Sequence, residues 1–70
     1  MRYTIVIEQS EGNHSAYVPD LPGCVATGSS VAEVEREICE AIWFHRYGLR
    51  EHGAPAPLPF SRVEYIDVAA

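Results

Sequence analysis

The chain has 70 residues, a formal net charge of −5, and five basic residues that are all arginine. This length predicts one domain, residues 1–70, and a domain this small buries only about 60% of its unfolded surface, which favours self-association. The acidic balance argues against a nucleic-acid binder, which needs a basic surface, and favours a basic partner instead. Two cysteines are too few for a disulfide framework, and Met1 leads directly into a strand pattern without an apolar leader, so we expect a cytoplasmic protein that does not cross a membrane.

Alternating apolar residues predict three short strands in the first part of the chain. The first covers residues 2–8, and a polar turn with Gly12 at a positive φ joins it to a second strand over residues 14–18. A third strand over residues 24–27, closed by Gly28, is expected to run antiparallel to the second.

The loop between the second and third strands is rich in residues with special backbone preferences. Pro19 ends the second strand, and Pro22-Gly23 suits the two central positions of a type II turn. We expect Asp20 to accept backbone N–H bonds within this turn. Cys24 is predicted to be a small buried thiol rather than a nucleophile.

A long helix follows this loop. Ser30 and Glu33 form a capping-box pattern, in which Ser30 accepts from the backbone at Glu33 and Glu33 reaches back. Gly53 suits the residue just past the helix, and Pro55 forbids continuation. The apolar positions with helical spacing are Val31, Val34, Ile38, Ala41, Ile42, His45 and Leu49.

The last part of the chain combines a stiff connector with a strand pattern. Residues 54–59 contain three prolines and are expected to be extended. Residues 62–68 alternate apolar side chains and predict a final strand, and its place after a single helix allows parallel pairing with the first strand at the sheet edge. The predicted fold is therefore α+β with the order β-β-β-α-β, one helix lying on a small sheet.

Most familiar catalytic patterns are missing from the sequence. The cysteines and histidines (Cys24, Cys39, His14, His45 and His52) show no ligand spacing, so we predict no metal and no cofactor. The helix carboxylates are explained by capping and by a solvated acidic face, and we predict that the protein is not an enzyme.

The helix also carries an unusual aromatic cluster. Trp43 and Tyr47 follow Cys39 at i, i+4, i+8 spacing, and Phe44 adds a further aromatic ring. With Glu37 and Glu40 beside them, these aromatic residues predict a partner-binding or oligomer interface. The alternative is that the proline-rich connector folds back and covers the rings.

The pattern Tyr17-x-Pro19-Asp20-Leu21-Pro22-Gly23-Cys24-x-x-x-Gly28, the capped helix and the run Leu49-Arg50-Glu51-His52-Gly53-x-Pro55-x-Pro57 resemble the HicB family. These proteins are antitoxins of type II toxin–antitoxin systems. The resemblance implies a reduced RNase H-like fold and neutralisation of a small, basic, RNA-cleaving HicA-like toxin. The same residues resemble solitary HicB-like interaction proteins equally well. Many members carry a C-terminal DNA-binding domain; the chain ends at Ala70 without one, so we expect no direct contact with nucleic acid.

Two other hypotheses stay open at this point. One is a minimal RNase H-like, metal-dependent nuclease that uses carboxylates such as Asp20 and Glu33. The other is a small-ligand-binding dimer that uses the surface around Trp43 and Tyr47.

Overall fold

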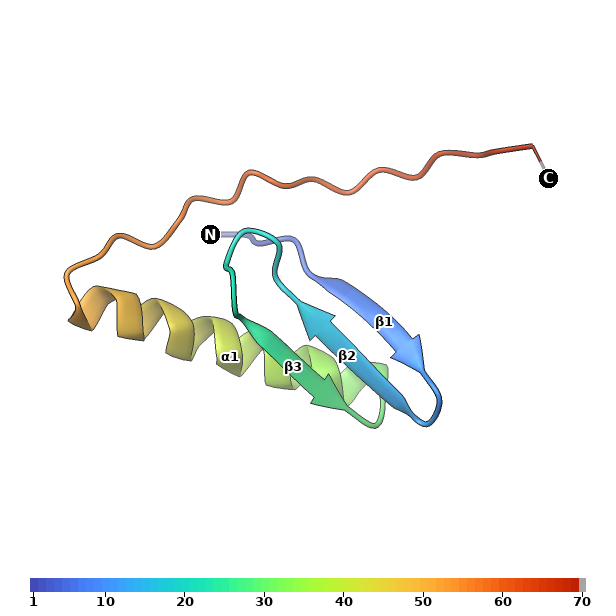
Figure 1. The fold of residues 1–70 in the computed structure, drawn as a ribbon, viewed down its shortest axis with the longest axis horizontal. Coiled ribbons are helices and arrows are strands. Elements are labelled where there is room, and N and C mark those ends of the chain that lie inside the picture. The colour runs from blue at the N-terminus through green and yellow to red at the C-terminus, as the bar shows by residue number, and fades with distance from the viewer. Residues whose placement is uncertain (70) are drawn as a thin grey trace.

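A three-stranded antiparallel sheet and one long helix form the body of the protein (Figure 1). The computed structural model describes residues 1–69. In chain order the elements are β1 (Val6–Ser10), β2 (Asn13–Tyr17), β3 (Val25–Gly28) and α1 (Val31–Glu51). The strand order β1-β2-β3 follows the sequence order. The α+β class with three strands before one helix is therefore confirmed.

The β1–β2 hairpin turns at Glu11-Gly12, where Gly12 has the predicted positive φ of 70°. Its ladder pairs Ser10 with Asn13 at the turn and Val6 with Tyr17 at the far end. Strand β1 begins four residues later than predicted because β2 stops before Pro19, which leaves residues 2–5 without an opposite strand.

The helix begins and ends where the local signals predict. The hydroxyl of Ser30 accepts a hydrogen bond of 3.1 Å from the backbone N–H of Glu33, which confirms the N-cap. The reverse half of the capping box is different, because the Glu33 carboxylate accepts from the hydroxyl of Ser29 at 2.7 Å. Gly53 follows the C-cap residue His52 with a φ of 71°.

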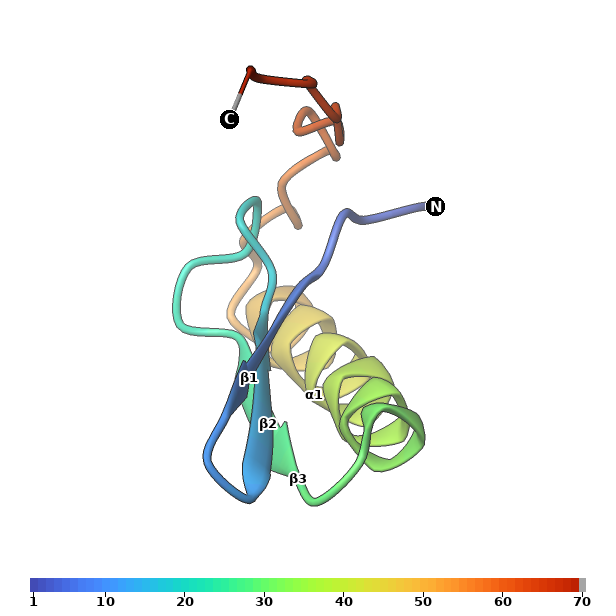
Figure 2. The same ribbon diagram turned by 90° about the vertical axis from the view of Figure 1, so that its right-hand side faces the viewer.

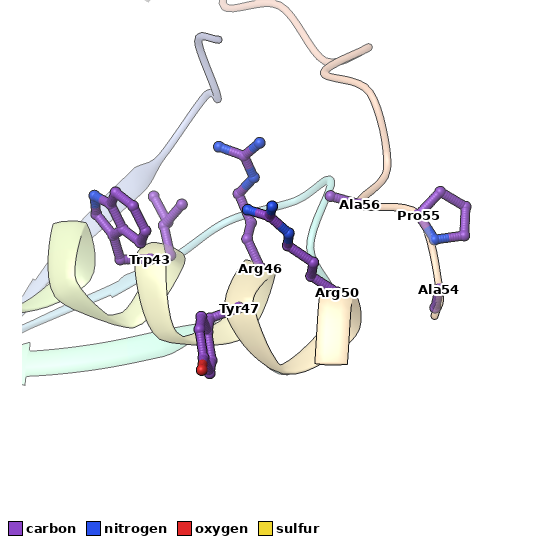
Figure 3. A pocket seen from close by; sticks show the side chains of 8 residues that line it. Trp43, Arg46, Tyr47, Arg50, Ala54, Pro55 and Ala56 are labelled. Atoms are coloured by element: carbon purple, nitrogen blue, oxygen red, sulfur yellow. The ribbon is translucent and has the colours of Figure 1, made fainter. Parts of the chain in front are cut away.

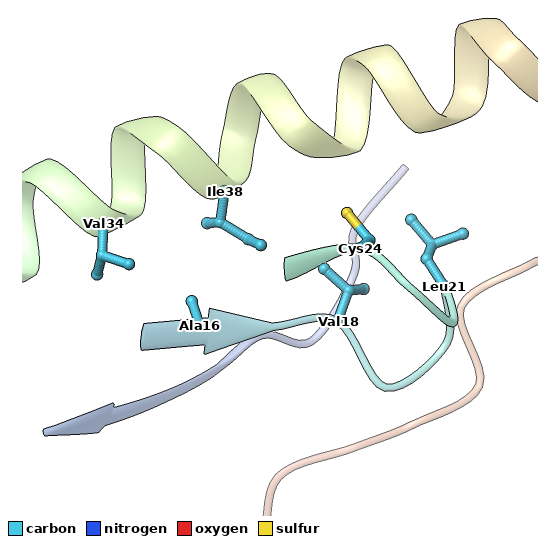
Figure 4. Close-up of a cluster of buried hydrophobic side chains, with 6 residues drawn as sticks. All are labelled: Ala16, Val18, Leu21, Cys24, Val34 and Ile38. Carbon is cyan, nitrogen blue, oxygen red and sulfur yellow. The ribbon is translucent and has the colours of Figure 1, made fainter. Parts of the chain in front are cut away.

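One face of the sheet packs against α1, as the view from the right-hand side of Figure 1 makes clear (Figure 2). Helix and sheet share a small core to which the loop between β2 and β3 also contributes (Figure 4). Its buried side chains are Ala16, Val18, Leu21, Cys24, Val34 and Ile38. The helix comes so close to β3 that a Cβ at Gly28 would lie 2.9 Å from the backbone nitrogen of Val34. Gly28 therefore sets the distance between the two layers.

The predicted final strand over residues 62–68 does not form. After Gly53 the chain runs extended alongside the body and then past it, with no ladder to β1 (Figure 1). Alternating side chains need a neighbouring edge within ladder distance to make a strand, and residues 62–69 have no ladder partner in the part of the chain that the structure describes. This C-terminal segment (residues 62–69) is exposed, with Tyr65 at 94% and Val68 at 84% of full exposure.

Candidate binding surface

The loop between β2 and β3 is held in one shape by its own backbone. The N–H of Cys24 donates to the carbonyl of Leu21 at 3.1 Å, which closes the predicted turn over Pro22-Gly23, and Gly23 has a φ of 84°. The N–H of Val18 also donates to the carbonyl of Cys24 at 3.2 Å. Cys24 is buried as predicted, and this burial raises the pKa of its thiol. These features give the loop a structural role.

Asp20 has a different partner from the one predicted. Its carboxylate accepts from the backbone N–H groups of Phe60 and Ser61, at 2.9 and 3.0 Å, and from the Ser61 hydroxyl at 2.5 Å. It does not serve its own turn; it anchors the chain that follows the helix. Burial raises the pKa of Asp20, but the hydrogen bonds from Ser61 and Phe60 outweigh it and hold the pKa below its ordinary value.

The five predicted interface residues share one face of α1. At about 3.6 residues per turn, Glu37, Glu40, Trp43, Phe44 and Tyr47 fall within an arc of about 120°. The buried helix residues Val34 and Ile38 lie on the opposite side. The sequence therefore brings these five residues together on the outer face of the helix, away from the sheet.

The aromatic patch, which we define as Trp43, Phe44 and Tyr47, is open to solvent. These side chains are 72%, 81% and 56% exposed. Together with Cys39 and Glu40 they line a shallow apolar depression of about 370 Å³. Large aromatic groups gathered on an exposed surface are typical of sites that bind another macromolecule.

A second hollow of about 320 Å³ lies at the C-terminal end of the same face (Figure 3). Trp43 and Tyr47 line one end of it, and Ala54 to Ala56 of the connector line the other. The connector therefore borders the rings without burying them, and the hypothesis that it covers the aromatic patch is wrong.

Two arginines were missed as part of this surface. Arg46 and Arg50 line the second hollow, one helical turn apart, and their side chains extend from the same side of the helix as Trp43, with Tyr47 pointing the other way (Figure 3). Positive charge near the C-terminal end of a helix is favourable in itself, so the position of these two arginines does not by itself indicate a surface role. Their i, i+4 spacing next to Trp43 and Tyr47 was the signal that could have placed them here.

The carboxylates considered for a nuclease are spread over the molecule. Both oxygens of Asp20 are used by the chain after the helix, Glu33 is bonded to Ser29, and Glu64 pairs with Arg62 at 3.0 Å. Within residues 1–69, no three His, Cys, Asp or Glu side chains come together as a metal-binding group.

The chain matches the family model of a HicB-like antitoxin of bacterial toxin–antitoxin systems over residues 3–69. This chain belongs to the HicB-like antitoxin family. The match includes the β2–β3 loop, the helix and the C-terminal segment.

Curated relatives agree with this family. A protein of 14.9 kDa from Haemophilus phage HP1, from the rep-hol intergenic region, is 34% identical over 67 residues, which is 96% of this chain and 50% of the phage protein. A UPF0150 protein of Helicobacter pylori is 48% identical over 42 residues, or 60% of this chain and 58% of the relative. A UPF0150 protein of Thermoplasma acidophilum is 36% identical over 58 residues, which is 81% of this chain and 84% of the relative.

The HicB-like chain spans only about half the length of the first two of these relatives. In its described residues, 1–69, no helix combines the length and the apolarity needed to cross a bilayer.

Proposed function

We propose that this HicB-like protein is a non-enzymatic antitoxin that binds and neutralises a small, basic, RNA-cleaving toxin through the outer face of α1. The family supplies the antitoxin role. The observation that carries the binding surface is the exposed aromatic patch, because an apolar cluster of this kind gains free energy when a partner removes it from water.

Charge supports a basic partner. The formal net charge is −5, and Glu37 and Glu40 lie beside the aromatic patch. Carboxylates around an apolar centre steer a basic protein toward the surface, and the aromatic contacts then hold it. A toxin that acts on RNA would meet this protein in the cytoplasm.

The direct test is co-expression with the product of the adjacent reading frame. We expect this product to be small and basic, to stop growth alone, and to be silenced by the intact chain while forming a complex on gel filtration. Unrelieved toxicity without a complex would contradict the proposal.

Two variants locate the surface. Trp43→Ala/Tyr47→Ala is expected to weaken toxin binding by about 1,000-fold, since two interface aromatics contribute about 2 kcal/mol each. Glu37→Lys/Glu40→Lys is expected to slow association. Glu11→Lys on the exposed β1–β2 turn changes charge away from α1 and serves as the matched control. Equal binding by all three variants would place the toxin elsewhere.

A second candidate function rests on the hollow between the aromatic rings and the connector. Two arginines beside Trp43 and Tyr47 are suited to a small aromatic or anionic ligand, which would stack on a ring and pair with a guanidinium. Quenching of Trp43 fluorescence by such compounds, abolished in Arg46→Ala/Arg50→Ala, would favour this function.

A further inference from the structure

Two incomplete elements lie in the same molecule. The C-terminal segment has a strand-forming sequence but pairs with no strand among the described residues, and Val63, Tyr65, Ile66 and Val68 are 58–94% exposed. Strand β1 is at the edge of the sheet, and within residues 1–69 its ladder partner is β2 alone, which leaves its outer row of backbone N–H and C=O groups without a ladder there.

Side chains separate residues 57–61, which lead into the C-terminal segment, from the residues that precede β1. The hydroxyl of Tyr3 donates to the carbonyl of Pro57 at 2.6 Å, and the hydroxyl of Thr4 donates to the carbonyl of Ser61 at 2.9 Å. A ladder needs two backbones about 4.8 Å apart, joined directly by N–H and C=O groups. Here a side chain stands between the backbones at both contacts, so no ladder begins.

The start of the C-terminal segment is also fixed. The N–H of Ser61 is bonded to Asp20 and its carbonyl to Thr4, so both backbone groups of Ser61 are already used. The three prolines before it stiffen the approach. Residues 62–69 therefore leave the body in a set direction, and the chain runs on beyond the sheet (Figure 1).

An open groove of about 710 Å³ lies where the paired strand was predicted. Residues 1–5 line one side of it, and Pro59, Ser61, Arg62 and Val63 line the other. The groove continues the line of β1 toward the N-terminus, so an added strand along the β1 edge would meet it directly.

We propose that the C-terminal segment of one chain adds as a strand to the β1 edge of a second copy, and that the two copies exchange these segments. A second copy is the occupant because it supplies both missing elements at once: each chain gives one strand and receives one. Such a reciprocal contact closes on itself as a two-fold dimer and leaves neither of the two segments unpaired.

The mass in solution tests the exchange. By light scattering, the full chain is expected to have the mass of two 7.8 kDa chains, and a chain that ends at Ser61 the mass of one. Truncation after Ser61 keeps the Asp20 anchor, and helical circular dichroism checks its fold. Trp43→Ala/Tyr47→Ala, which alters only α1, is the control and is expected to stay dimeric. A monomeric full chain or a dimeric truncated chain would overturn the proposal.

A pair of proline variants tests the strand pairing without truncation. An edge strand donates N–H groups from alternate residues only, and proline is tolerated at the others. One of Val63→Pro/Tyr65→Pro and Glu64→Pro/Ile66→Pro is therefore expected to raise the dimer dissociation constant by about 1,000-fold, because two ladder bonds are lost in each of the two exchanged segments, and the other by far less. Equal effects in both would mean apolar association without a ladder and would reject the exchange.

Discussion

Gly28 controls the contact between β3 and α1. A Cβ at this position would lie 2.9 Å from the nitrogen and 3.2 Å from the Cα of Val34, and a helix backbone packed on a sheet cannot move away at low cost. Gly28→Ala is therefore expected to lower the free energy of unfolding by about 1–3 kcal/mol. Urea denaturation at fixed protein concentration measures this change.

Gly48 supplies the matched control for that measurement. It lies in the C-terminal half of α1, and a Cβ added there would meet no atom of another element within 4 Å. Gly48→Ala is expected to raise the free energy of unfolding by about 0.5–1 kcal/mol, because alanine has less freedom to lose on folding. Destabilisation by both variants would contradict the steric role of Gly28.

Asp20 makes the anchoring of the C-terminal chain dependent on pH. Its pKa lies below the ordinary value of 3.8 in the folded protein. The ionised carboxylate therefore contributes fully to the stability of the anchor above pH 3.8, and this contribution is lost as the pH falls through the lower folded pKa. The amides of Phe60 and Ser61 are expected to lose protection from hydrogen exchange over that range of acid pH.

Asp20→Asn tests the same anchor at neutral pH. The amide keeps one acceptor oxygen but loses the charge, so exchange at Phe60 and Ser61 is expected to rise about tenfold or more. The variant is also expected to lose the acid dependence. Unchanged protection would show that the hydroxyls of Tyr3 and Thr4 hold the chain by themselves.

At the level of elements, the helix depends on its N-terminal cap. Ser30→Ala removes the acceptor of the Glu33 N–H and is expected to cost about 1 kcal/mol of stability. Ser29→Ala removes only an exposed side-chain bond to Glu33 and is expected to change stability by less than about 0.5 kcal/mol. Thermal unfolding followed by helical circular dichroism compares the two variants. A larger loss of stability in Ser29→Ala than in Ser30→Ala would contradict the prediction.

The elements that the sequence predicts well are those with local signals. The Ser30 cap, Pro22-Gly23 and Gly53 each act within a few residues, and all three lie where they were expected. The last strand was mispredicted because alternation describes two faces but cannot supply a neighbouring edge. The partner of Asp20 was missed for a similar reason, since Ser61 is 41 residues away and no local pattern marks the pair.

The candidate surface, too, could be predicted from the sequence only in part. Helical spacing places Trp43, Phe44 and Tyr47 together with Glu37 and Glu40, and only their exposure required the structure. The hollow beside Arg46 and Arg50 could not be predicted, because the connector forms one side of it. The three prolines predict that the connector is extended, but not the direction in which it runs.

For the whole molecule, the acidic charge predicts how the proposed complex responds to salt. Association with a basic toxin is expected to slow as the ionic strength rises to about 0.15 M, where the Debye length is about 8 Å, while dissociation changes little. Stopped-flow measurements with Trp43 fluorescence report both rates. In Glu37→Lys/Glu40→Lys the dependence on salt is expected to be weaker, and a salt-independent wild-type rate would contradict electrostatic steering.

The Asp20 anchor also sets an order of folding. The hairpin, β3 and α1 follow one another in sequence and close short loops, whereas the bond from Asp20 to Ser61 closes a loop of 41 residues and has the larger entropic cost. During synthesis, Ser61 leaves the ribosome after every strand and the helix. Two copies would therefore meet as folded bodies, and the rate of strand exchange would depend on their concentration rather than on unfolding.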